Sequence, residues 1–586
     1  MKKILFAITA LSIPVLLFLG LEFGLRLNSL YTPYPLFIPL PSNTEYLIAN
    51  PEFGTQYFPD FKPSIAPIPF SKVKKDSTLR IVTLGGSSAA GFPYQSSFSF
   101  SGQLFRHLLY NFPQYQCEVI NLSMTAINSY QYVDMIDEII AIQPDVVLVY
   151  GGHNEFFGAY GTASNFGFSM INHPLVKQLI IKLNKLALIQ VPKKIIANSK
   201  DKSKDSRTLM SKTIKEVSIP YKEDLYNSTI EQFEFNMQTI LTSLEKHSIP
   251  VILSTIGSNL KDQKPLGTSS YADSLYQLAN QIRIKSDKIK ADSLYMAAKE
   301  QDPLRFRAPE EINLILEKLN SAFNNSYLID GKSSLKSISV SGIEDNSVYT
   351  DHLHPNDLGH YTLSVLFFKA IICVLNLKEV MFDETVAPYL PISSFDKTYA
   401  EIQIAKLTSE FPFEKNRSES SSNFIFTQKA KEIMSKSYSD SLSALTYVKH
   451  LFVIEQLSKA TTHELNLKDT LSYAAHAWSL ANWQLFNKKY FTRCLEILSK
   501  NPNTEEFALD LSLIAANYHK ESIFYEMNGA YLLKLNKLKT AKYWLEKSVE
   551  LNPKSTYSWY NLARLSVLNG DTLAAKKYFD RYVQLK

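Results

Sequence analysis

Short, β-branched apolar runs recur along the first half of the chain, and small or polar residues follow most of them. The runs are LRIVTL (79–84), CEVINL (117–122), DVVLVY (145–150) and VILSTI (251–256). Helical patterns lie between them, such as YQYVDMIDEIIAI (130–142) and IEQFEFNMQTILTSLEKH (230–247). Strands that are apolar on both faces and alternate with helices are typical of a parallel sheet covered by helices. The sequence therefore predicts an α/β domain, with SYLID (326–330) as a weaker fifth strand.

The end of the chain repeats itself at the 34-residue spacing of a known helical repeat. Residues of similar kind recur in register: Tyr525 with Trp559, Gly529 with Ala563, Ala541 with Ala575, and Leu545 with Phe579. The pattern resembles the tetratricopeptide repeat, in which small residues lie where two antiparallel helices touch. Stability usually needs at least three repeats. We therefore expect the helix-like residues at 425–520 to complete an all-α repeat domain over 425–586, clearest at 522–586.

Composition and cysteine content bound the class of protein. A chain of 586 residues is too long for one compact core. Its composition, with 45% hydrophobic and 20% charged residues, is that of a folded protein. Cys117, Cys373 and Cys494 are too few and too far apart for a disulfide framework or a four-cysteine zinc site. The net charge of +6 is spread over the chain, and no basic stripe with interleaved aromatic residues points to nucleic acid.

Residues 1–26 are predicted to be a membrane anchor. Lys2 and Lys3 precede an almost wholly apolar run over 4–21, which is long for a signal-peptide core and near the minimum for a membrane-spanning helix. Charged residues such as Arg26 follow, rather than a small-residue cleavage site. With the lysines in the cytoplasm, the rest of the chain would lie on the periplasmic side of a bacterial inner membrane. A signal that is cleaved is the alternative.

Three further segments differ in composition from the domains that they join. Residues 27–75 are expected to form a stalk or strap, because nine of the 26 prolines lie here and exclude helix or central strand. The lysine-rich segment 193–212 favours a solvated loop or mobile lid over an anion-binding patch. Residues 381–424 are predicted to link the α/β domain (76–380) to the repeats and to leave the two parts separable.

Chemistry-bearing residues follow the predicted strands. The carboxyl ends of parallel strands meet at one edge of a sheet, where sites form. The residues there are Gly85, Gly86 and Ser87 after the first strand, Asn121 and Ser123 at the second, Gly152, His153, Asn154 and Glu155 after the third, and Asp351 and His354 in TDHLHPND. A serine activated by an imidazole, a carboxylate behind that imidazole and amide donors for an oxyanion are the parts of an acyl-transfer site.

Other glycine-rich motifs fail on detail. Ala89 stands where a nucleophile elbow, G-x-S-x-G, needs its second glycine. Phe92 follows Gly91 where a phosphate-binding loop needs lysine, and the G-x-G spacing of a dinucleotide fingerprint is absent.

With these blocks in order, residues 79–375 resemble the SGNH/GDSL hydrolase superfamily. The chain also resembles a bacterial membrane-anchored subgroup of this superfamily. The features that carry this resemblance are the N-terminal anchor, GGSS, RFRAP (305–309) and the repeats at the end of the chain. The resemblance implies a flavodoxin-like, three-layer fold that works without a cofactor. It implies Ser87 as the nucleophile, His354 as the base and Asp351 as the partner that orients the base.

The resemblance also implies an oxyanion hole made of the Asn154 side chain and the N–H groups of Ser87 and Ser123. The chain departs from the family's pattern at three places. Gly86 and Glu155 replace aspartates that are usual in the family, and Ser123 stands where the second block normally has glycine. The last position contributes a backbone N–H, so a small residue can still serve.

The candidate catalytic residues have structural alternatives. Ser87 could cap the following helix, and Asn154 could cap a turn. His352 beside His354 could form a metal pair, but further His or Cys at ligand spacing is lacking, so we predict no metal.

Other polar residues are interpreted as structural. His153 and His360 are expected to have no part in the chemistry. Arg305 and Arg307 could bind an anionic substrate, but a salt-bridged role at the surface is the simpler interpretation.

The resulting prediction is an extracytoplasmic serine esterase or deacylase acting on an acylated glycan, a lipid or a small ester. The repeats would recruit a protein partner, because repeat solenoids present extended binding surfaces. Two alternatives stay open. One is an acyltransferase that moves acetyl groups with the same triad, and the other is a repeat-based scaffold whose hydrolase domain is vestigial.

Overall fold

The structure is a computed structural model. It describes residues 2–58, 61–63, 65–167, 173–198, 209–215, 218–285, 287–377, 387–409, 411–413, 478, 485–499 and 504–586. The helices predicted between 425 and 477 lie outside the described residues.

Five parallel strands form the central sheet: β4 (Thr78–Gly85), β5 (Gln116–Asn121), β6 (Val146–Tyr150), β7 (Val251–Ser254) and β8 (Ser326–Ile329). Their spatial order is β5-β4-β6-β7-β8, which is the 2-1-3-4-5 arrangement of flavodoxin-like folds. Val82 at the centre pairs with Ile120 on one side and Val147 on the other. Every residue of β4, β6 and β7 is buried, as strands covered on both faces should be. The predicted α/β class and the fifth strand are confirmed.

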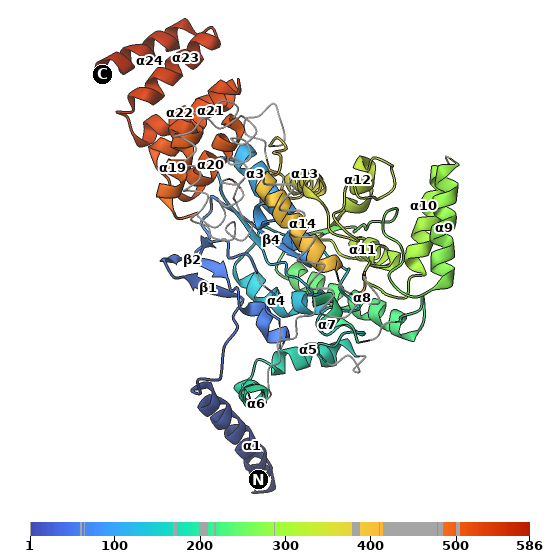
Figure 1. The fold of residues 1–586 in the computed structure, drawn as a ribbon. Coiled ribbons are helices and arrows are strands. Elements are labelled where there is room, and N and C mark those ends of the chain that lie inside the picture. The colour runs from blue at the N-terminus through green and yellow to red at the C-terminus, as the bar shows by residue number, and fades with distance from the viewer. Residues whose placement is uncertain are drawn as a thin grey trace.

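Helices cover both faces of this sheet and complete three layers (Figure 1). The first crossover, from β4 to β5, runs in the opposite direction to the later crossovers. Because such connections are right-handed, its helix lies on the opposite face of the sheet from the helices of the later crossovers. One layer contains α3 (Phe100–Asn111), α12 (Gly331–Ile338) and α13 (Asp357–Val374); the other contains α4 (Ser129–Ala141), α8 (Asp224–Glu245) and α11 (Glu310–Ala322). Beyond the layers, α9 (Ser270–Ile284) and α10 (Lys288–Glu300) form a hairpin.

One helix of the described chain, α13, is long and apolar enough to cross a membrane by length and hydropathy alone. It packs against α3 and the strands β7 and β8, and Leu363, Phe367 and Phe368 are fully buried there. The apolar character of α13 is therefore that of a core helix.

The N-terminal residues run along the α/β domain. After α1 (Lys2–Arg26), a small antiparallel sheet contains β1 (Phe37–Leu40), β2 (Asn43–Ala49) and β3 (Phe70–Ser71). Pro39 lies in the edge strand β1, where the missing N–H is tolerated. The short 3-10 helix η1 (Phe53–Tyr57) packs on the domain, and the Tyr57 hydroxyl donates to Asp134 Oδ2 at 2.5 Å. The segment thus lies across the domain as a strap.

The insertion between β6 and β7 holds α5 (Pro174–Leu183), α6 (Ala187–Asn198) and α7 (Leu209–Thr213). Part of the predicted loop 193–212 is therefore helical, and residues 199–208 lie outside the described chain. The carboxylate of Glu22 in α1 accepts the N–H groups of Ala187 and Leu188 at 3.0 and 2.9 Å. This contact ties the end of α1 to the start of α6.

The C-terminal part is entirely helical in the residues described: α19 (Lys488–Leu498), α20 (Glu505–Tyr518), α21 (Ser522–Lys534), α22 (Leu538–Leu551), α23 (Thr556–Leu568) and α24 (Thr572–Leu585). Helices α21 and α22 pack as a pair, and so do α23 and α24. A Cβ at Gly529 would lie 2.4 Å from Leu545 Cγ, so the two helices approach closely at this glycine. The predicted helical-repeat architecture is confirmed.

The repeats pack on the free edge of the central sheet. Asn517 of α20 bonds twice to the backbone of the edge strand β5 at Cys117: its Oδ1 accepts the N–H at 3.1 Å, and its Nδ2 donates to the carbonyl at 3.0 Å. Arg106 of α3 forms a fully buried ion pair with Asp510 of α20. The prediction that the two parts are separable is therefore wrong for these helices, because their contact buries charged and polar groups.

Residues within and after the predicted linker also contact the α/β domain. The ring of Trp478, from the predicted repeat region, packs edge-on against the ring of Phe98 at 5.0 Å. Phe98 follows the candidate nucleophile by eleven positions. Within residues 381–424, α14 (Ser394–Thr408) forms a helix beside the site described next (Figure 1).

Candidate active site

Ser87 lies where β4 ends and a four-residue helix, α2 (Ser87–Ala90), begins. Gly86 occupies the N-cap position and Gly91, with φ of +101°, closes the turn in the left-handed region that favours glycine. Small residues on both sides therefore let the chain turn sharply and leave the Ser87 hydroxyl at the end of the strand.

Three side chains form a continuous hydrogen-bonded line. His354 Nε2 lies 2.8 Å from Ser87 Oγ, and His354 Nδ1 lies 2.6 Å from Asp351 Oδ2. The other carboxylate oxygen of Asp351 accepts the N–H groups of Leu353 and His354, each at 2.9 Å. The structure thus brings together the serine, histidine and aspartate that the sequence singled out, across 267 residues of sequence separation.

Asp351 is fully enclosed by protein and remains ionised. Burial alone would raise its pKa, but the charges of His354 and His352 and their hydrogen bonds hold the pKa of Asp351 well below the usual range of a carboxyl group. An ionised carboxylate on Nδ1 fixes the tautomer of His354 that presents Nε2 to Ser87.

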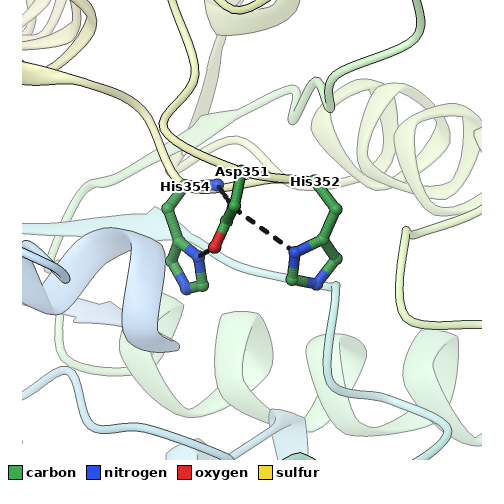
Figure 2. A group of neighbouring side chains, drawn as sticks. All are labelled: Asp351, His352 and His354. Carbon is green, nitrogen blue, oxygen red and sulfur yellow. Dashed lines mark hydrogen bonds and ion pairs between the residues drawn. The ribbon is translucent and has the colours of Figure 1, made fainter. Parts of the chain in front are cut away.

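His352 approaches the same carboxylate from the other side, as Figure 2 shows. Its Nδ1 is 3.3 Å from Asp351 Oδ1, and burial lowers the pKa of His352. Possible ligand atoms of Asp351, His352 and His354 lie within 4.8 Å of one another, a spacing that would suit a metal ion. Both ring nitrogens of His354 are already bonded, to Asp351 and Ser87, so the arrangement has the geometry of a triad.

Asn154 lies beside the triad, four residues after β6. Its Nδ2 donates one hydrogen to the Ile127 carbonyl at 2.9 Å, and the side chain lines the same cavity as Ser87. A Cβ at Gly86 would come within 2.6 Å of Asn154 Nδ2. Glycine before Ser87 therefore leaves room for this amide.

The structure does not bring Ser123 to the cavity. The Ser123 N–H donates to Asn121 Oδ1 at 3.0 Å, and the residue does not line the space around Ser87. Ala126 does line it, and its φ of +61° lies in the region that favours glycine. The Ala126 N–H has no acceptor within the described residues. The sequence analysis assigned this N–H donor to Ser123, three residues before Ala126, although Ala126 is the smallest residue in the turn SMTAIN.

Glu155, which also differs from the pattern described in the sequence analysis, has a structural role. Its two carboxylate oxygens accept the N–H of Ser129 at 3.0 Å and its hydroxyl at 2.7 Å, which fixes the start of α4. Burial raises the pKa of Glu155 to about 7.

The structure also assigns the remaining polar residues that the sequence raised. His153 Nδ1 accepts the N–H of Ala308 at 3.1 Å, and burial lowers the pKa of His153, as it does that of His360, to about 3. Arg305 and Arg307 are buried, and they donate to backbone carbonyls at 2.6–3.0 Å. The predicted surface role of the two arginines is wrong: they hold loops together in the interior, and neither lines the cavity.

A cavity of about 400 Å³ opens at Ser87. Its inner wall is aromatic, with Phe92, Phe157 and Phe306. Three segments from outside the sheet complete the wall: Phe61 of the strap, Met210 and Thr213 of α7, and Gln403 and Leu407 of α14. Residues predicted as a stalk or strap, a solvated loop or mobile lid, and a linker therefore line the cavity.

Solved structures of similar fold include ester-cleaving enzymes. A Bacteroides fragilis protein described as an acylhydrolase is 14% identical, covering 52% of this chain and 91% of its own, at a TM-score of 0.28. A GDSL-like lipase from Bacteroides thetaiotaomicron is 11% identical, covering 52% and 91%, at 0.26. A lipase/acylhydrolase from Enterococcus faecalis is 15% identical, covering 52% and 99%, at 0.26.

Similarity at these identities and TM-scores does not identify functional residues. The assignment of the site rests on the distances given above. No curated protein matches the chain. A family model of the tetratricopeptide repeat matches residues 544–577. Over about half of its length the chain is similar to solved structures described as a GDSL-like lipase and a lipase/acylhydrolase, and residues 544–577 match a tetratricopeptide repeat.

Proposed function

We propose that this chain is an extracytoplasmic serine hydrolase that cleaves carboxylic esters through Ser87, His354 and Asp351. The observation that carries the proposal is the line of hydrogen bonds from Asp351 through His354 to Ser87, at 2.6 and 2.8 Å, beside an open cavity. The capping alternative for Ser87 loses support, because Gly86 and not Ser87 occupies the N-cap position of α2.

The reaction would proceed in two halves. His354 Nε2 takes the proton of Ser87 as Oγ attacks the ester carbonyl, and the ionised Asp351 stabilises the imidazolium that forms. His354 then gives the proton to the leaving alcohol, which leaves an acyl group on Ser87. A water molecule, deprotonated by His354, attacks this acyl-enzyme, and the proton returns to Ser87 as the acid is released.

Three donors would stabilise the oxyanion of each half-reaction. Asn154 keeps one Nδ2 hydrogen beyond its bond to Ile127, and the N–H groups of Ser87 and Ala126 have no acceptor within the described residues. Preorganised donors of this kind each contribute about 100- to 1000-fold in rate. Ala126 takes the part that the sequence assigned to Ser123.

The aromatic wall supports an ester whose acyl group enters an apolar space. Phe92, Phe157 and Phe306 surround the serine, and an apolar lining with a few convergent polar groups is typical of a small-molecule site. We propose an acylated glycan, a lipid or a small ester as substrate, on the periplasmic side of the membrane.

Two further parts of the proposal concern location and partner. In the anchor, the described apolar side chains from Ile13 to Phe23 are largely exposed, as in a helix surrounded by lipid. At the other end, Tyr557, Tyr560 and Leu573 of the repeats are exposed and support the recruitment of a protein partner.

The direct test is hydrolysis of a short-chain activated ester by the full chain in detergent. Ser87→Ala and His354→Ala should each lower kcat by orders of magnitude, since triad members act as a unit. Ser88→Ala, the neighbouring buried serine, is the matched control and should retain most of the rate. If His352→Ala abolishes the rate and His354→Ala does not, the base is misassigned and the proposed mechanism fails.

A further inference from the structure

Helix α5 is apolar on its exposed face, which is unusual for a helix at a soluble surface. This face is the stripe Leu175, Val176, Leu179 and Leu183, at the helical spacing of one continuous side. The buried residues are Ile181 and Lys177, whose ammonium donates to the Tyr160 carbonyl and to Gln232 Oε1 at 2.8 and 2.9 Å. The helix thus buries a hydrogen-bonded lysine while three leucines stay exposed.

The same helices carry only positive charge. Residues 173–198 contain five lysines and no aspartate or glutamate. Lys177 is buried and Lys185 pairs with Asp134 at 2.8 Å, whereas Lys182 and Lys193 are exposed at the surface. An apolar stripe flanked by lysines is the pattern of a helix that lies in the interface of a bilayer with anionic lipids.

Contacts with α1 place this face at the level where a membrane would end. Helix α1 is about 37 Å long, enough to cross a hydrocarbon core of about 30 Å, and Glu22 near its end holds the first turn of α6. Just beyond, Arg26 lies over the ring of Tyr31, and Lys194 of α6 lies over Tyr34. Tyrosines and cationic side chains at a helix end are characteristic of the membrane–water interface.

We propose that the exposed face of α5, continued by Ile195 of α6, is a second membrane-contact surface that rests on the bilayer beside the anchor α1. This inference rests on the proposed anchor and adds an orientation to it. In Figure 1, α1, α5 and α6 lie together at one end of the molecule, and α23 and α24 lie at the opposite end. Helix α7, which lines the cavity, belongs to the same insertion between β6 and β7 as α5 and α6.

The experiment measures lipid contact at single positions in the full chain. In a Cys373→Ser background, which removes the exposed native thiol, an environment-sensitive fluorophore is attached to Leu179→Cys, Phe18→Cys or Ile289→Cys. Leu179 and Ile289 are exposed apolar residues of α5 and α10, at 55% and 83%, so Ile289 is the matched control. The protein is reconstituted in vesicles of phosphatidylethanolamine and phosphatidylglycerol, with and without lipid that carries a quencher on its acyl chain.

The proposal predicts blue-shifted, lipid-quenched fluorescence at 179 and 18 and neither effect at 289. Quenching at 18 but not at 179 would overturn the contact surface and leave the anchor standing. No quenching at either would overturn both. A blue shift at 179 without quenching by lipid would assign the face to a second copy or another protein, and would also overturn the proposal.

Discussion

At the scale of single residues, the site depends on the close packing of the residues beside Ser87. Gly86 and Asn154 form one unit, because a side chain at 86 would occupy the position of the amide that is proposed to bind the oxyanion.

The unit gives a testable pair of substitutions. Asn154→Ala should lower kcat on an activated ester by about 100-fold or more, the effect of losing one oxyanion donor. Gly86→Ala should lower it as well, because the new Cβ, 2.6 Å from Asn154 Nδ2, must displace the amide. In a double-mutant cycle the two losses should overlap. Fully additive losses would mean that Gly86 does not act through Asn154.

Glu155 predicts a pH dependence of stability. Burial raises its pKa from 4.5 to about 7, so the native state binds a proton more tightly than the unfolded chain does. The resulting stabilisation is complete below pH 4.5 and is lost as the pH rises through about 7, on the order of 3 kcal/mol in all. Thermal unfolding between these pH values should show an apparent Tm that falls with pH in the native protein and falls less in Glu155→Gln. Parallel pH profiles would contradict this role.

At the scale of elements, β5 is an edge strand that α20 covers. An uncovered edge presents unpaired N–H and C=O groups, and the Asn517 amide satisfies both at Cys117 in the way a neighbouring strand would. Helix α20 is therefore part of the structure of the α/β domain.

Asn517→Leu tests this contact. The substitution leaves a buried donor and a buried acceptor unsatisfied, which costs about 1–3 kcal/mol for each group. The apparent Tm should fall by several degrees, whereas Asn569→Leu, at an exposed position of α23–α24, should change it little. Equal Tm values for the two variants would show that the contact with Cys117 does not stabilise the protein.

The elements that the sequence predicted best are those whose pattern is local. The five strands of the sheet and the helix pairs after residue 522 follow from apolar periodicity, and Ser87 follows from its place at the end of a strand. Asp351 and His354 lie in the loop before α13 and follow from the motif TDHLHPND. The place of Ala126 at the cavity could not be predicted, because its positive φ depends on the turn and leaves no mark on an alanine. The docking of α20 on β5 joins residues 400 positions apart, and no local pattern encodes it.

At the scale of the whole molecule, the α/β domain lies between two groups of helices. One end carries α1 with α5 and α6, for which a membrane contact is proposed, and the other carries α23 and α24 (Figure 1). In this arrangement the terminal repeats lie at the end of the molecule away from the proposed membrane.

The same arrangement predicts the effect of truncation. A chain that ends at residue 413 would expose the edge of β5 and the surface of α3 that packs against α20, and it would lose the ion pair between Arg106 and Asp510. We expect the fragment to be poorly soluble and to have little esterase activity. A soluble monomer with the rate of the full chain would show instead that the repeats are dispensable for the enzyme.

The central claim is that Ser87 is a nucleophile activated by His354, and a fluorophosphonate that reacts with activated serines tests it most directly. The full chain is treated with the reagent, digested, and the modified peptide is mapped by mass spectrometry. The account predicts one adduct, on Ser87, that is absent in Ser87→Ala, strongly slowed in His354→Ala and retained in Ser88→Ala. An adduct on another serine, or labelling at Ser87 that proceeds at the same rate without His354, would contradict it.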